Sequence, residues 1–141
     1  MSSSEPNVKR VHLAWTGEGL AFQGRAAAGT SLVLDGDAEQ APSPTDALLL
    51  SLAGCMAIDI LHILKKSRVS ITALTADVEG ERAEKPPRRF ESVRIVFTVT
   101  GPEAEDESRM ERALALSEGT YCSVLHTLRS DLRLDLSVRR G

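Results

Sequence analysis

Short segments in which apolar and polar residues alternate recur along the chain, and this period of two is typical of β-strands. Between residues 90 and 100, for example, Val93, Ile95 and Phe97 fall on one face and polar residues such as Arg94 on the other. The pattern predicts six strands, at residues 8–15, 20–27, 31–34, 69–82, 90–100 and 132–138. The fourth and fifth of these are expected to form a long hairpin.

One long segment is apolar on nearly every side of a helix. It runs from Asp46 to about Ser67, with Pro44 suited to the first turn. The pattern predicts a helix of about 20 residues that is buried on most faces. Its longest apolar stretch, residues 47–58, falls short of the ~20 residues that a membrane span needs, so no membrane partner is expected. One small sheet cannot cover such a helix, and we therefore expect a homodimer with this helix at its centre.

Two further helices are predicted at 106–117 and 121–128, between the fifth and sixth strands. Strands thus come in runs joined by short turns, which favours an α+β fold with antiparallel sheets. The length of 141 residues suits a single domain, 1–141, in which residues 1–6 form a flexible tail.

Charge and composition narrow the function. There are 17 basic and 20 acidic side chains, a net charge of −3, so nothing indicates a nucleic-acid partner. The first residues lack the features of a signal peptide, and we expect a cytoplasmic protein. No phosphate-binding glycine loop or metal-spaced Cys/His cluster occurs, so neither a cofactor nor a metal is expected.

Three polar residues share one face of the long predicted helix: Cys55, Asp59 and His62. They could form a Cys/His/Asp site. The alternative is a helix end with two polar residues that turn toward solvent.

The two cysteines, Cys55 and Cys122, carry the stronger indication of chemistry. In a reducing compartment a bond between them would be transient and functional rather than structural. Cys55 lies mid-helix among apolar residues, where core packing is the simpler interpretation. Cys122 follows a predicted cap at Thr120, and the helix dipole there would make it the more easily ionised thiol. The alternative for Cys122 is a small residue packed under a helix start.

The segment from Ser43 to Asp59, Ser-Pro-Thr-Asp followed by an apolar run and Gly54-Cys55, resembles the central-helix signature of the OsmC/Ohr family. These are the osmotically inducible and organic hydroperoxide resistance proteins. The segment around Cys122, residues 113–124, is similar to the family's second motif, although Ser123 stands where the family usually has proline. The resemblance implies an OsmC-like fold, an intertwined homodimer with antiparallel sheets packed around a long central helix.

The resemblance also implies a cysteine-based peroxidase that acts in oxidative stress defence. Cys55 would be the peroxidatic cysteine, oxidised by an organic hydroperoxide to a sulfenic acid, and Cys122 the resolving cysteine that forms a disulfide with it. Asp46, where the family usually has glutamate, would hold an arginine that activates Cys55. Arg25 is the candidate for this arginine, with Arg10 behind it.

A dithiol reductant, lipoyl or thioredoxin-like, or a small thiol would then restore both cysteines. The alternative hypothesis is a catalytically weak or inactive OsmC-like stress or small-molecule-binding protein on the same fold.

Overall fold

The computed structural model describes residues 7–141, and the predicted tail, 1–6, lies outside this range. The contacts divide the chain into two compact units, one up to Leu48 and one from Leu49 to Gly141. Each unit contains one three-stranded sheet. The long helix α1, Pro44–Lys66, begins in the first unit and continues in the second. The expectation of one domain over 1–141 stays a prediction.

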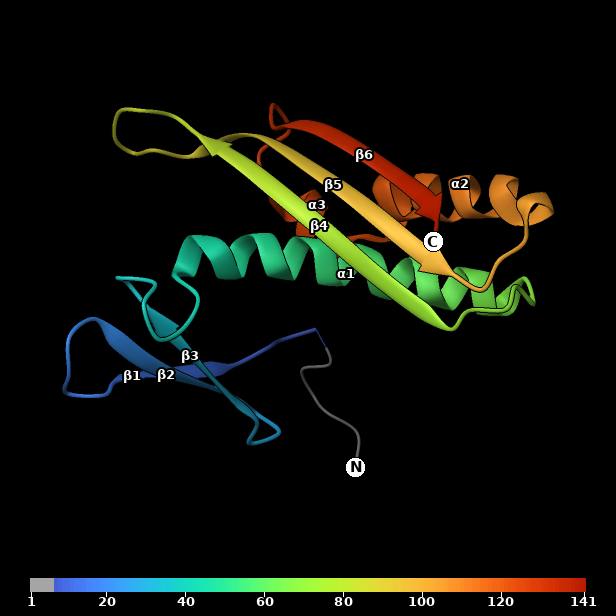
Figure 1. The fold of residues 1–141 in the computed structure, drawn as a ribbon. Coiled ribbons are helices and arrows are strands. Elements are labelled where there is room, and N and C mark those ends of the chain that lie inside the picture. The colour runs from blue at the N-terminus through green and yellow to red at the C-terminus, as the bar shows by residue number, and fades with distance from the viewer. Residues whose placement is uncertain (1–6) are drawn as a thin grey trace. The chain divides into compact units, whose positions relative to one another are not determined.

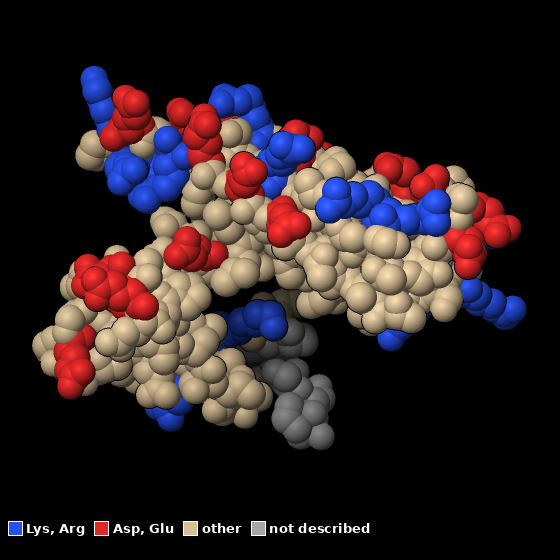
Figure 2. All heavy atoms as spheres, in the orientation of Figure 1, with Lys and Arg blue, Asp and Glu red and all other residues tan. Residues whose placement is uncertain are grey.

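The first unit is an antiparallel meander of β1 (Val11–Trp15), β2 (Ala21–Ala26) and β3 (Ser31–Asp35) (Figure 1). The register places apolar residues of all three strands on one face of the sheet. They are Val11, Leu13, Trp15, Phe22, Leu32 and Leu34. Arg25 pairs with His12 on the opposite face. Figure 2 shows a mostly uncharged surface over this sheet.

The second unit contains β4 (Ala73–Arg82), β5 (Phe90–Thr100) and β6 (Arg133–Arg140), in the order β4-β5-β6. The predicted hairpin of β4 and β5 is confirmed, and β5 has the predicted bounds. The apolar face of β5 lies over α1 (Figure 1). Figure 2 shows acidic and basic side chains interspersed on the visible surface of this unit.

The expectation of purely antiparallel sheets is wrong for one pair, because β6 pairs with β5 in parallel. The chain between them forms η1 (Ala104–Asp106), α2 (Glu107–Leu116), η2 (Ser117–Tyr121) and α3 (Ser123–Thr127). Such a helical crossover returns the chain to the end of the sheet from which β5 started, so the next strand runs the same way. This crossover carries Cys122.

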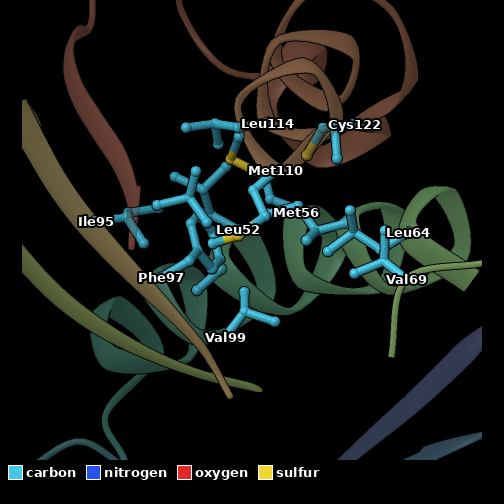
Figure 3. Packing of buried hydrophobic residues seen from close by; sticks show 14 of the residues in the cluster. Leu52, Met56, Leu64, Val69, Ile95, Phe97, Val99, Met110, Leu114 and Cys122 are labelled. Atoms are coloured by element: carbon cyan, nitrogen blue, oxygen red, sulfur yellow. The ribbon is translucent and has the colours of Figure 1, made fainter. Parts of the chain in front are cut away.

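The core of the second unit lies between the sheet and one side of α1. Figure 3 shows its largest members, with Cys122 at one edge of the cluster next to α1. The fully buried side chains include Leu52, Met56, Ile60 and Leu64 from α1, Ile95, Phe97 and Val99 from β5, and Met110 from α2.

The opposite side of α1 is apolar but exposed, with Leu50 at 60% and Ile58 at 57% exposure. By length and composition alone, the 23-residue α1 could cross a membrane, and only 28% of its most apolar 18-residue window is buried. The helix predicted from Asp46 to about Ser67 is confirmed, and Asp59 lies within it.

Candidate functional site

The structure brings the two cysteines of the chain together. Cys55 lies on α1 and is half-buried, whereas Cys122 follows η2 and is completely buried, at 0% exposure. The two thiols lie close enough to interact, because Cys55 contributes to the raised pKa of Cys122, and neither is in a disulfide. The partly accessible thiol of Cys55 therefore lies beside the completely buried thiol of Cys122.

Cys122 is held in place as the N-cap of α3. Its Sγ accepts a hydrogen bond from the backbone N–H of Leu125 at 3.4 Å. The prediction that Thr120 caps this helix is wrong, because Thr120 lies within η2 and α3 begins at Ser123. The sulfur thus has a fixed partner in the backbone of its own helix, and the Cys55 thiol lies near it.

Burial raises the pKa of the Cys122 thiol to about 11. The hydrogen bond from Leu125 opposes this shift, and interactions with Cys55 and with the Asp59 charge add to it. The prediction that the helix dipole makes Cys122 easily ionised is therefore wrong, since desolvation outweighs the start of a five-residue helix. At neutral pH Cys122 is a protonated thiol.

The turn before Cys122 is anchored to α1. Residues Ser117–Tyr121 form a π-helical turn, closed by a 2.9 Å hydrogen bond from the N–H of Cys122 to the carbonyl of Ser117. The Ser117 hydroxyl is fully buried and donates to Oδ2 of Asp59 at 2.8 Å. Sequence reasoning missed Ser117, because it lies 58 residues from Asp59. The signal in the sequence was Asp59 itself, a carboxylate within an otherwise apolar helix that needs a polar partner.

The predicted Cys55–Asp59–His62 face is used in a different way. Asp59 binds Ser117, and His62 is exposed. Both side chains line a groove of about 550 Å³ beside α1, which Cys55 does not line. The other residues of the groove are Ile63, Lys66, Ser67, Arg112, Leu116 and Tyr121.

Asp46 caps the start of α1. Its Oδ2 accepts the N–H of Ser43, and the Ser43 hydroxyl accepts the N–H of Asp46, both at 3.1 Å, a reciprocal capping box. Asp46 and the exposed Arg25 belong to the first unit, and the two cysteines to the second. The roles of Arg25, Arg10 and Asp46 toward Cys55 stay predictions.

Among residues 7–141, no group of three or more His, Cys, Asp or Glu side chains is arranged to hold a metal ion. The two cysteines offer sulfur chemistry, with one partly accessible thiol and one protonated thiol near it.

A paired-thiol site beside a long helix, within an α+β fold of two three-stranded sheets, defines the class of protein. The family model for OsmC-like protein matches residues 36–137, and the chain belongs to this family. The predicted family and the α+β OsmC-like fold are thereby confirmed.

Individual relatives agree with this assignment. Protein YhfA of Escherichia coli strain K12 is 39% identical over 116 residues, which cover 82% of this chain and 85% of YhfA. A hypothetical protein from Aquifex aeolicus has a similar structure, with a TM-score of 0.83 at 29% identity, covering 96% of this chain and 97% of that one. The structure of an organic hydroperoxide resistance protein OsmC from Legionella pneumophila gives a TM-score of 0.65 at 18% identity, with 95% and 98% covered.

Proposed function

We propose that this protein is a cysteine-based peroxidase that reduces organic hydroperoxides in oxidative stress defence. The observation that carries the proposal is the proximity of the Cys55 and Cys122 thiols, which interact closely enough for Cys55 to help raise the pKa of Cys122. Two neighbouring thiols need little movement to form a disulfide. Membership of a family that includes hydroperoxide resistance proteins supports the same chemistry.

In the first step, the thiolate of Cys55 attacks the distal oxygen of the hydroperoxide. The O–O bond breaks, the alkoxide leaves as an alcohol after taking a proton, and Cys55 becomes a sulfenic acid. Cys55 suits this step because it is the partly exposed thiol of the pair. The neighbouring Cys122 thiol is protonated at neutral pH and is not the nucleophile of this step.

In the second step, the sulfur of Cys122 attacks the sulfenic sulfur of Cys55. The S–O bond breaks, the hydroxyl leaves with the Cys122 proton as water, and a disulfide forms. A dithiol reductant, lipoyl or thioredoxin-like, then returns both cysteines to thiols by exchange. The reductant would attack Cys55 first, because Cys122 is completely buried.

We further propose that the protein is a homodimer in the cytoplasm, without a membrane or nucleic-acid partner and without a cofactor. The exposed apolar residues Leu50 and Ile58 on α1, and Leu13, Trp15 and Leu32 on the first sheet, support the dimer. Within it, Arg25, held by Asp46, is the proposed arginine that activates Cys55.

The test is thiol counting by mass spectrometry on the reduced protein. One equivalent of cumene hydroperoxide should convert both thiols to an intramolecular disulfide, and more efficiently than hydrogen peroxide does. Cys55→Ser should abolish hydroperoxide consumption, whereas Ser123→Ala, at an exposed neighbour of Cys122, should not change it.

A second candidate is a catalytically weak or inactive OsmC-like stress or small-molecule-binding protein. The complete burial of Cys122 and its pKa of about 11 favour it, because a thiol held in this state is a slow nucleophile. Persistence of both free thiols after excess cumene hydroperoxide would support this candidate and reject the peroxidase.

A further inference from the structure

Asp59 lies one helical turn after Cys55 on α1, and its carboxylate binds the turn that leads into Cys122. One five-residue span of helix, residues 55–59, therefore carries both the reacting thiol of Cys55 and the carboxylate that anchors the turn before Cys122. We propose that Asp59 is a positioning residue for disulfide formation, holding Cys122 against Cys55 through its hydrogen bond to Ser117. This inference deepens the proposed function and rests on it.

Ser117 connects Asp59 to Cys122 through two hydrogen bonds. Its hydroxyl is fully buried and donates to Asp59 at 2.8 Å, while its carbonyl accepts the N–H of Cys122 at 2.9 Å. The path from the carboxylate to the second cysteine thus passes through a single residue. A hydrogen bond to a charged acceptor is stronger than a hydrogen bond between neutral groups, so the Ser117–Asp59 hydrogen bond is a strong one.

The segment that the Asp59–Ser117 hydrogen bond holds is a π-helical turn. Turns of this kind are uncommon and occur often at functional sites, because they are less favourable than a continued α-helix. Here the turn separates α2 from α3 and leaves Cys122 extended, as the N-cap of α3. A second polar contact stabilises the same turn, because Nε2 of His126 lies 2.9 Å from the carbonyl oxygen of Glu118.

The Asp59 carboxylate also acts on the Cys122 sulfur through its charge, which helps to keep that thiol protonated. Other titratable groups lie near the carboxylate or interact with the same sulfur. His62 and Lys66 from α1, Arg112 from α2 and Tyr121 from η2 line the groove that Asp59 lines, and Cys55 interacts with Cys122.

Four variants distinguish the positioning role of Asp59 from the effect of its negative charge. Asp59→Ala and Ser117→Ala remove the hydrogen bond, whereas Asp59→Asn keeps an acceptor oxygen and removes the charge. Glu118→Gln is the matched control, because it removes an equal charge from an exposed side chain of the same turn. Formation of the Cys55 sulfenic acid, trapped with dimedone, and formation of the disulfide are measured separately after a pulse of cumene hydroperoxide.

Asp59→Ala and Ser117→Ala should slow disulfide formation by about tenfold or more, since small displacements of reacting groups are costly. The rate of sulfenic acid formation should stay near that of the unchanged protein. Asp59→Asn should retain most of the rate and shift its pH profile to lower pH, because loss of the negative charge makes Cys122 easier to ionise. Equal slowing of both steps, or wild-type disulfide formation in Ser117→Ala, would overturn the inference.

Diamide provides an arm that does not depend on the peroxidase reaction. It accepts two electrons and two protons from a pair of thiols, becomes a hydrazine and leaves a disulfide. The same order of rates is expected with diamide, even if cumene hydroperoxide is not consumed. Unchanged diamide rates in Asp59→Ala and Ser117→Ala would contradict the positioning role of Asp59. Failure to consume cumene hydroperoxide would contradict the proposed peroxidase only, so the two failures are distinguishable.

Discussion

The sulfur of Cys122 accepts the backbone N–H of Leu125 at 3.4 Å, so the second thiol of the site is also the cap of a helix. A residue placed in this way has both a structural and a chemical role. The two roles can be separated by replacements that keep or remove the acceptor.

Cys122→Ser should fold normally, because a serine oxygen is a good N-cap acceptor. Cys122→Ala should lose about 1–2 kcal/mol of stability, since the Leu125 N–H loses its partner and a small cavity forms. Urea unfolding of the reduced proteins measures the difference. Both variants should accumulate the Cys55 sulfenic acid after hydroperoxide treatment; equal stability of the two would argue against the capping role.

Gly101 ends β5 with a φ of +117°, and a Cβ there would lie 2.6 Å from the carbonyl oxygen of Ser70. Gly101→Ala should therefore destabilise the protein by about 1–3 kcal/mol. Gly17 is the matched control, because it also has a positive φ, +93°, but a Cβ there would meet nothing within 4 Å. Thermal unfolding should show a clearly larger loss for Gly101→Ala than for Gly17→Ala.

Asp35 is a buried carboxylate whose oxygens accept the backbone N–H groups of Gln40, Asp37 and Glu39. These hydrogen bonds lower the pKa of Asp35 below its ordinary value of 3.8. The stability that it contributes is thus present above the unfolded-state pKa and is lost as the pH falls through the lower folded-state pKa.

Asp35→Asn should accordingly lower the Tm at pH 7, and the difference from the unchanged protein should shrink as the pH falls below 3.8. Asp77→Asn, at an exposed position of β4, is the control. A difference in Tm that stays constant from pH 7 to pH 3 would contradict the assignment.

The proposed homodimer can be tested on α1. Ile58→Glu places a charge on the exposed apolar side of the helix, where a partner subunit would bury it at considerable cost. We expect this variant to sediment as a monomer, whereas Thr75→Glu, on the exposed side of β4, should not change the mass. A monomer for the unchanged protein at micromolar concentration would reject the dimer.

Hydrophobic patterning located the elements well. The alternation from Phe90 to Thr100 gave the bounds of β5, and the apolar run after Pro44 gave α1. These features depend on neighbours in sequence, which a pattern captures. The parallel pairing of β6 with β5 depends instead on the direction in which a 32-residue crossover returns the chain, and no local pattern reports it.

The candidate site was predictable in part for the same reason. Cys55 and Cys122 stand out as residue types, but the burial that raises the pKa of Cys122 depends on side chains far away in sequence. The link between Asp59 and Ser117 spans 58 residues, and the residues after Ser117 are typical of a simple helix break.

The parallel strand has a consequence for synthesis. β6 emerges from the ribosome after the crossover, so a nascent chain that has not yet reached Arg133 holds its second thiol on a segment tethered at one end only. During this interval the thiol can exchange with a small disulfide, forming a mixed disulfide and releasing a small thiol. Oxidative conditions would therefore threaten the protein most while it is being made, before β6 has paired with β5 and completed the second sheet.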